Sequence, residues 1–380
     1  MTTIQITSSK IPKLRLSEFS WEWKKERFDY LFQINAGWDI NKENSSNTKN
    51  NIFKYNIFAN SDKRKWLYWY SNIYKIEWET ITVTWRWNLW VAIARYEKYF
   101  PIVRLLVLKP KEKSDVYFFE NAINNINFFV ESTWVPQLTW PQISNYKIWY
   151  PSLPEQQKIA SFLSLVDEKI ENIKEKKKSL EEYKKGVMQK IFSQEIRFKD
   201  ENWEEFGEWE EKKLGDILEY EQPTKYIVDS TEYKNNYNTP VLTAWKTFIL
   251  WYTNEDSWIF QAKNKSVIIF DDFTTSKQFV NFDFKVKSSA MKILINIDDN
   301  ISNIKYIFEF MQTIKFSLWD EHKRFWISEY SKVKIFLPSL IEQEKIADFL
   351  SWIDDKIENV KVEIEKTKKF KKGLLQNMFI

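Results

Sequence analysis

The chain has 380 residues, a net charge of +4, 43% hydrophobic residues and no cysteine. This length suffices for two or three domains, and the absence of cysteine excludes a disulfide framework and thiolate metal sites. The mild positive charge permits a nucleic-acid partner without requiring one. Because the chain has neither a signal-peptide pattern nor a run of 18 apolar residues, we expect a cytoplasmic protein without a membrane partner.

Tryptophan and glycine occur in unusual proportions, with 20 Trp and 5 Gly. Glycine usually makes up about 7% of a protein. Several Trp stand in turn-like stretches, as in "TWRWNLW" (84–90). The sequence predicts that many of them are glycines in the natural product, through a UGA codon that the host reads as Gly. The alternative is a Trp-rich protein with aromatics for stacking on bases. We expect Trp23, Trp209 and Trp326 to be genuine.

Residues 1–150 are expected to form a first mixed α/β domain. "ETITVT" (79–84) alternates in hydropathy like a strand, and "PIVRLLVLK" (101–109) is a further strand candidate. Residues 115–130 have helical spacing.

Residues 151–193 are expected to form one long helix. Pro154 and Glu155 favour the start of a helix. Apolar residues then recur in alternating steps of four and three, which is the seam of a coiled coil; they are Ile159, Leu163, Val166, Ile170 and Ile173.

The rest of the chain repeats this plan. Residues 207–218 match 21–32, and 194–337 form a second α/β candidate domain with strands at 265–270 and 290–297 and a helix at 302–318. Residues 338–379 match 151–192 at a constant offset of 187, with 22 of 42 positions identical. The second helix, within 338–380, carries the equivalent seam of Ile346, Leu350, Ile353, Ile357 and Val360.

Each helix would extend about 57 Å at 1.5 Å per residue, and so long an apolar seam needs a partner. A repeated unit paired with itself favours a two-fold axis, which makes the helices antiparallel. We therefore predict an α+β fold: two mixed α/β domains separated by two long helices that form an antiparallel coiled coil, with an internal pseudo-two-fold repeat. The alternative is that each helix has a separate partner.

No catalytic constellation is found in the sequence. The single histidine, His322, stands among charged residues, and the acidic pair at 271–272 has no metal-ligand spacing after it. A dinucleotide-binding context is missing around residues 84–90. We expect no catalytic residue, no metal site and no cofactor in this chain.

Basic and hydroxyl-rich loops between strands are the remaining candidates for function. Lys and Arg side chains hold phosphates, whereas Arg, Asn, Gln, Thr and Ser read base edges. Two such domains held apart by a rod suit DNA half-sites about one helical turn apart. The candidate DNA-binding residues are Lys63, Arg64, Lys65, Thr84, Arg86, Asn88, Thr243, Lys246, Thr247, Thr274, Thr275, Ser276, Lys277, Gln278, Lys323 and Arg324.

The sequence resembles the specificity subunit of type I restriction–modification systems over essentially its whole length. The resemblance rests on "LPSL-x-EQ-x-KIA-x-FLS" at the head of each long helix, on "EFGEWEEKKLGDI", and on "PVLTAWKTFILWYTNE", "IIFDDFTTSKQF" and "DEHKRFWISEYSKVKI". The family has Gly where Trp245 and Trp251 stand.

The resemblance implies two target-recognition domains that read an asymmetric, bipartite DNA sequence, with the helices as a ruler. It also implies that the helices dock two modification subunits, which bring S-adenosylmethionine, and restriction subunits, where the host has them, which bring ATP and Mg. The residues expected to serve helix pairing and docking are Glu155, Gln156, Glu342 and Gln343 together with the two apolar seams.

Two alternatives stay open at this point. The chain could be the DNA-binding part of another restriction enzyme with its own chemistry, which nuclease or methylation activity of the isolated chain would favour. It could also be a coiled-coil scaffold that binds proteins only. Loss of duplex-DNA binding after Arg86→Ala and Lys246→Ala would argue against the scaffold.

Overall fold

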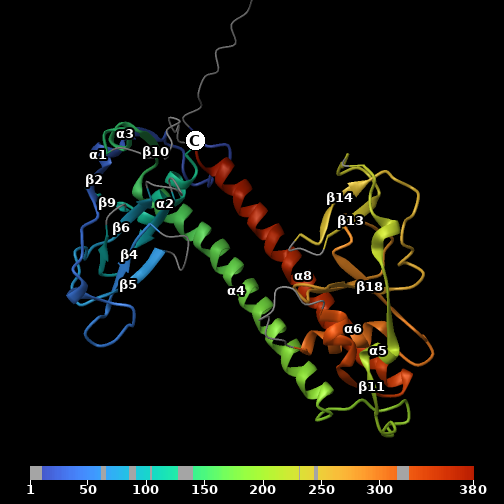
Figure 1. Ribbon diagram of the computed structural model, residues 1–380. Helices are drawn as coiled ribbons and strands as arrows, with labels where there is room; N and C mark the ends of the chain where they lie inside the picture. Colours follow the sequence, from blue (N-terminus) through green and yellow to red (C-terminus); the bar gives the residue numbers. More distant parts are fainter. Residues whose placement is uncertain are drawn as a thin grey trace, which may run out of the picture. The chain divides into compact units, whose positions relative to one another are not determined.

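The computed structural model describes residues 11–60, 66–84, 91–102, 105–126, 140–230, 232–243, 247–314 and 325–380. It divides into two compact units. The first unit comprises residues 1–174 and 362–380, and the second comprises 175–361 (Figure 1). Because this division cuts both long helices, each unit contains one recurring α/β domain and one part of each helix.

The first unit is built on two four-stranded sheets and a two-stranded ribbon. One sheet has the antiparallel order β2-β9-β6-β7, the other has the order β3-β5-β4-β8, and the ribbon pairs β1 with β10. The strand bounds are β1 Lys24–Arg27, β2 Phe32–Ala36, β3 Ser45–Ser46, β4 Tyr55–Phe58, β5 Leu67–Ser71, β6 Thr80–Thr84, β7 Ala92–Arg95, β8 Tyr99–Pro101, β9 Leu105–Pro110 and β10 Lys147–Tyr150.

The second unit repeats this topology. Its sheets have the orders β12-β18-β15-β16 and β14-β13-β17, and its ribbon pairs β11 with β19. The parallel pairing of β4 with β8 recurs as the pairing of β13 with β17. The strand bounds are β11 Glu210–Lys213, β12 Leu218–Glu221, β13 Thr239–Leu242, β14 Ile249–Thr253, β15 Val267–Asp271, β16 Lys277–Val280, β17 Lys285–Val286, β18 Met291–Asn296 and β19 Lys334–Leu337.

The helices follow the same repeat and agree with the periodicity of the sequence. The expected long helices are α4, with 40 residues, and α8, with 39 residues. No helix within the described ranges is both long enough and apolar enough to cross a membrane. The bounds are α1 Phe28–Leu31, α2 Val116–Asn124, α3 Trp140–Asn145, α4 Leu153–Phe192, α5 Leu214–Ile217, α6 Ile304–Thr313, α7 Phe325–Ser328 and α8 Leu340–Met378.

The expected strands and shorter helices are present with different ends. The strand expected at 101–109 is β9, which begins at Leu105. The helix expected at 115–130 is α2, which ends at Asn124, and the part at 127–130 lies outside the described residues. The helix expected at 302–318 is α6, which ends at Thr313, and the part at 315–318 lies outside the described residues.

Antiparallel packing of the two long helices is observed inside each unit. In the first unit, Ile159 and Leu163 of α4 share one apolar core with Leu374 and Met378, near the end of α8. In the second unit, Ile191, at the end of α4, shares a core with residues near the start of α8. The start of each helix therefore packs on the end of the other, as the repeat predicts. Each of these cores also includes apolar side chains of the α/β domain.

Candidate functional site

The start of α4 is joined to the N-terminal segment by a buried carboxylate. The guanidinium of Arg15 donates two hydrogen bonds of 2.7 Å to Glu155, and the indole of Trp23 donates a third, of 3.2 Å. Glu155 is 2% exposed. The hydrogen bonds to Glu155 raise the pKa of Arg15.

The same arrangement recurs at the start of α8. Arg197 donates to Glu342 with bonds of 2.8 and 3.3 Å, and the indole of Trp209 donates a bond of 3.1 Å. The bonds to Glu342 raise the pKa of Arg197 as well. Trp23 and Trp209, two of the three tryptophans expected to be genuine, therefore have a specific hydrogen-bonding role, which a glycine could not fill.

A glutamine beside each glutamate joins the long helix to the shorter helix of the domain. Gln156 donates to the carbonyl of Pro151 at 2.9 Å and accepts from the amide of Asp115, the N-cap of α2. Gln343 donates to Pro338 and accepts at 2.8 Å from the amide of Asn303, the N-cap of α6. The "EQ" pair of each repeat therefore fixes the angle between a long helix and its own domain.

These contacts correct the expectation that the "EQ" residues present a docking surface. Glu155, Gln156, Glu342 and Gln343 are at most 3% exposed and are satisfied inside their own unit. The two apolar seams are in place: the residues Ile159, Leu163, Val166, Ile170, Ile173, Ile346, Leu350, Ile353 and Val360 are buried, and Ile357 is half-buried.

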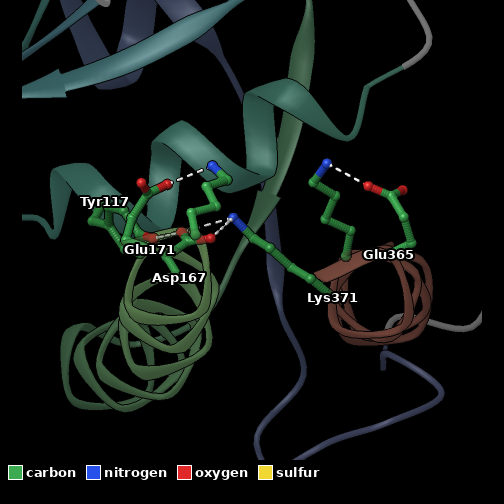
Figure 2. Close-up of polar contacts among 7 residues, drawn as sticks. Tyr117, Asp167, Glu171, Glu365 and Lys371 are labelled. Carbon is green, nitrogen blue, oxygen red and sulfur yellow. Dashed lines mark hydrogen bonds and ion pairs between the residues drawn. The ribbon is translucent and has the colours of Figure 1, made fainter. Parts of the chain in front are cut away.

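Ion pairs between the long helices are a feature that the sequence did not disclose. In the first unit, the ammonium of Lys371 on α8 lies 2.6 and 2.7 Å from the two carboxylate oxygens of Asp167 on α4 (Figure 2). In the second unit, Lys184 on α4 lies 2.7 and 2.8 Å from Asp354 on α8. Asp354 and Lys371 occupy the positions of Asp167 and Lys184 in the repeat.

The hairpin between β15 and β16 presents several of the candidate DNA-binding residues. Asp271, at the end of β15, accepts hydrogen bonds from the amide of Phe273 and from the hydroxyl of Thr274. Thr275 has a φ of 58°, and its amide donates to the carbonyl of Asp271. This short, tightly bonded turn leaves Thr274 and Ser276 exposed and Thr275 half-buried.

Lys277 and Gln278 follow this turn on β16. The ammonium of Lys277 donates to the hydroxyl of Tyr330 at 3.1 Å, and burial lowers its pKa to about 8. Lys277 and exposed Gln278 line a groove of about 580 Å³, together with Lys184, Gln312 and Thr313. The groove contains donor and acceptor groups of the kinds that contact phosphates and bases.

The turn between β13 and β14 contributes two more candidates, and Thr84 requires a correction. The hydroxyl of Thr243 donates to the carbonyl of Thr247 at 2.7 Å, and Thr247 is exposed. Thr84 is 1% exposed at the end of β6, and its hydroxyl accepts from the amide of Val91. Because β6 is buried along its whole length, Thr84 supports the sheet and does not lie on a reading surface.

Half of the sequence-predicted DNA-binding residues lie outside the described residues. They are Lys63, Arg64, Lys65, Arg86, Asn88, Lys246, Lys323 and Arg324. Among the residues that are described, no group of three or more His, Asp or Glu side chains is placed to hold a metal ion.

Comparison with known proteins gives the family of the chain. The family model "Type I restriction modification DNA specificity domain" matches twice, over residues 21–182 and 207–369. The specificity subunit of the Escherichia coli type I restriction enzyme EcoR124I/EcoR124II is 52% identical over 133 residues. This match covers 35% of the present chain and 33% of the E. coli protein, so the chain spans about a third of that relative's length.

Two further comparisons extend over most of the chain. The putative type I restriction enzyme MjaX specificity subunit of Methanocaldococcus jannaschii is 28% identical over 301 residues, which cover 72% of this chain and 69% of that protein. The crystal structure of the type I restriction–modification S subunit from M. genitalium has the same fold, with a TM-score of 0.65, 17% identity and coverage of 97% and 99% of the two chains. With two copies of the domain spanning most of its length, the chain belongs to the type I restriction–modification DNA specificity family.

Proposed function

We propose that this chain is the non-catalytic DNA-recognition subunit of a type I restriction–modification complex. In this proposal each α/β domain reads one half of a bipartite target, and the two halves differ because the two domains differ in sequence. The observation that carries the proposal is the repeated topology, in which two domains of one fold each adjoin a long helix, and the second domain exposes polar side chains on its β15–β16 hairpin. Hydroxyl, amide and ammonium groups on such turns can contact bases and phosphates.

Catalysis is assigned to partner subunits. Two modification subunits would bind along the repeated helices α4 and α8, bring S-adenosylmethionine and methylate adenine. Restriction subunits, where the host has them, would bring ATP and Mg. The chain would act in the cytoplasm, where the host DNA is methylated. The repeat of the helix sequence supports two copies of the same partner, because a surface that occurs twice can be recognised twice.

Methylation mapping tests the proposal directly. The chain is expressed together with its modification subunit in a host without other adenine methylation, and methylated adenines are mapped across the genome. We expect one bipartite motif with a fixed gap. If the methylated sites are the same with and without this chain, the proposal fails.

Variants of the β15–β16 hairpin test the division of labour between the domains. Thr274→Ala combined with Gln278→Ala should relax or weaken the reading of one half-site and leave the other unchanged, because each bidentate base contact contributes about 1–3 kcal/mol of discrimination. Gln222→Ala, at an exposed position of the same domain outside the candidate DNA-binding residues, is the matched control and should leave both half-sites unchanged. Changes in both half-sites would contradict the assignment.

A further inference from the structure

The ion pairs Asp167–Lys371 and Lys184–Asp354, here called the register pairs, are related by the internal repeat. Lys184 follows Asp167 by 17 residues on α4, and Asp354 precedes Lys371 by the same 17 residues on α8. In an antiparallel helix pair, a step toward the C-terminus of one helix corresponds to an equal step toward the N-terminus of the other. Both register pairs therefore satisfy one and the same alignment of α4 with α8.

The register pairs differ from the other ion pairs on the helices. Glu171 on α4 pairs with Lys174, and Glu365 on α8 pairs with Lys368, each three residues along its own helix. Such pairs stay intact whatever the alignment of the two helices. In Figure 2, Lys371 alone among the labelled residues crosses from α8 to α4, where it meets Asp167. The register pairs therefore depend on the alignment, and the others do not.

Each register pair is completed by a side chain from the adjoining α/β domain. In the first unit, the hydroxyl of Tyr117 on α2 donates to Asp167. In the second unit, Lys305 on α6 lies 3.6 Å from Asp354, and the fully buried Glu309 lies 2.8 Å from Lys184 and 3.0 Å from Lys305. Both sets contain equal numbers of positive and negative charges. A shift of either helix would leave charges unpaired at a partly buried site, which is costly.

A slip of one heptad in either direction is unfavourable at both register pairs. In one direction Lys371 would face Lys174, and Lys184 would face Lys361, so that like charges meet twice. The coiled-coil principle that polar seam residues specify alignment applies here to charged pairs.

A shift of one heptad in the opposite direction is unfavourable for a different reason. Lys371 would then face Ala160, and Lys184 would face Ala347. Both alanines are buried in apolar cores, at 5% and 3% exposure. An ammonium group placed there would lose its partner and its water.

We propose that Asp167, Lys184, Asp354 and Lys371 are specificity-determining residues that fix the alignment of α4 with α8 and thereby the gap between the two half-sites. The alignment of the helices is inferred from the ion pairs alone. Its effect on the gap between the half-sites rests on the proposed function. A slip of one heptad moves a helix by about 10 Å, the length of roughly three base pairs of DNA. The gap is therefore sensitive to alignment.

Charge reversal tests the inference in the complex with the modification subunit. Lys371→Asp should reduce methylation at the wild-type motif about tenfold or spread it over motifs with other gaps, and Asp167→Lys in the same chain should restore the original gap. The matched control is Lys334→Asp, which breaks an exposed ion pair with Glu211 in the β11–β19 ribbon and should keep the motif and its gap. Wild-type methylation by Lys371→Asp would overturn the inference.

Zero-length cross-linking gives a readout that does not depend on methylation. A carbodiimide joins an ammonium and a carboxylate in contact as an amide, with loss of water. Mass spectrometry of the treated wild-type chain should find Lys371 joined to Asp167 and Lys184 joined to Asp354. Cross-links from Lys184 to Glu344 or Glu365, ten and eleven residues from Asp354 on α8, in place of the link to Asp354 would overturn the alignment even if no variant folds. A wild-type chain with these cross-links but no bipartite motif would refute the proposed function and leave the alignment standing.

A second, independent inference concerns the tryptophans. Five non-glycine residues in the described ranges have positive φ, and three of them are Trp66 (71°), Trp203 (66°) and Trp258 (52°). None of the five glycines has positive φ. A bulky residue is strained in this region, whereas glycine is not. We infer that Trp66, Trp203 and Trp258 are glycines in the natural protein, as the composition predicts.

Trp203 and Trp258 allow a sharp test because they are 81% and 67% exposed and have little packing to lose. Trp203→Gly combined with Trp258→Gly should raise the midpoint of thermal unfolding of the chain as written. Trp21→Gly is the matched control, because Trp21 is 82% exposed without positive φ, and it should not raise the midpoint. Peptides of the protein from its own host should contain Gly at 66, 203 and 258 and Trp at 23 and 326. Tryptophan at the first three positions would overturn the inference.

Discussion

The indole nitrogen of Trp23 donates a hydrogen bond of 3.2 Å to the carboxylate of Glu155, 132 positions later in the chain. Trp209 and Glu342 have the same relationship in the second repeat, at 3.1 Å. In both places an arginine neutralises the carboxylate from the other side. The first turn of each long helix is therefore held by its own domain through one buried ion pair and one indole.

Loss of the carboxylate should be strongly destabilising. Glu155→Ala leaves the guanidinium of Arg15, which is 9% exposed, without its counter-charge, and removal of one partner of a buried pair costs about 3–5 kcal/mol. Urea unfolding would measure the change. Lys158→Ala, on the same helix as Glu155, removes an exposed ion pair with Glu18 of the N-terminal segment and should cost less than about 1 kcal/mol. Equal losses for the two variants would contradict the role of Glu155.

Loss of Gln156, the residue after Glu155, should also destabilise the protein, but by less than loss of Glu155. Gln156→Ala leaves the carbonyl of Pro151 and the amide of Asp115 without their partner, and each unpaired buried group costs about 1–3 kcal/mol. Hydrogen exchange at the start of α2 should speed up. The neighbouring Gln157 is exposed, so Gln157→Ala should change neither stability nor exchange. Unchanged exchange in Gln156→Ala would argue against a link between α4 and α2.

Stability should depend on the protonation of Lys277. Burial lowers its pKa from 10.5 to about 8, so between these pH values the unfolded chain binds a proton that the folded chain has released. Stability contributed by this group therefore rises with pH from about 8 and does not vary below it. The midpoint of urea unfolding, measured from pH 7 to 10, should rise less for Lys277→Gln than for the wild type. Lys263→Gln, at an exposed position, should keep the wild-type slope. Equal slopes for wild type and Lys277→Gln would refute the prediction.

The side chains of α6 that accompany Asp354 should be replaceable by the residue types that accompany Asp167 in the first repeat. Because Asn303 aligns with Asp115 as an N-cap, Lys305 and Glu309 occupy the places of Tyr117 and Asn121. Glu309→Asn leaves two lysines against one carboxylate and should destabilise the second unit by about 3 kcal/mol. Adding Lys305→Tyr should recover at least half of this loss. A double variant that is less stable than Glu309→Asn alone would contradict the assignment.

The helices and strands of this fold can be predicted from the sequence because their apolar residues recur with short-range periodicity. The seam from Ile159 to Ile173, its copy from Ile346 to Val360 and the alternation in 79–84 predict elements that are present. The repeat also predicts the antiparallel packing of α4 and α8, since a unit that pairs with its copy follows a two-fold relation.

The contacts that define the site depend on distances along the chain that no local pattern encodes. Arg15 meets Glu155 from 140 positions away, and Lys371 meets Asp167 from 204 positions away. The constant offset of 187 marks these carboxylates as recurring but does not name their partners. Thr84 was misplaced for the opposite reason: the end of a strand usually leads to the surface, but β6 is buried to its last residue.

The ribbons at the base of the domains have a consequence for how such proteins diversify. Lys24 on β1 faces Tyr150 on β10, and Glu210 on β11 faces Leu337 on β19, so each domain begins and ends at the same place. Residues can be inserted, deleted or exchanged inside this closed loop while the chain still enters the long helix at an unchanged position. Under the proposed function, replacement of the interior would change the DNA half-site that is read and leave the two long helices unaltered.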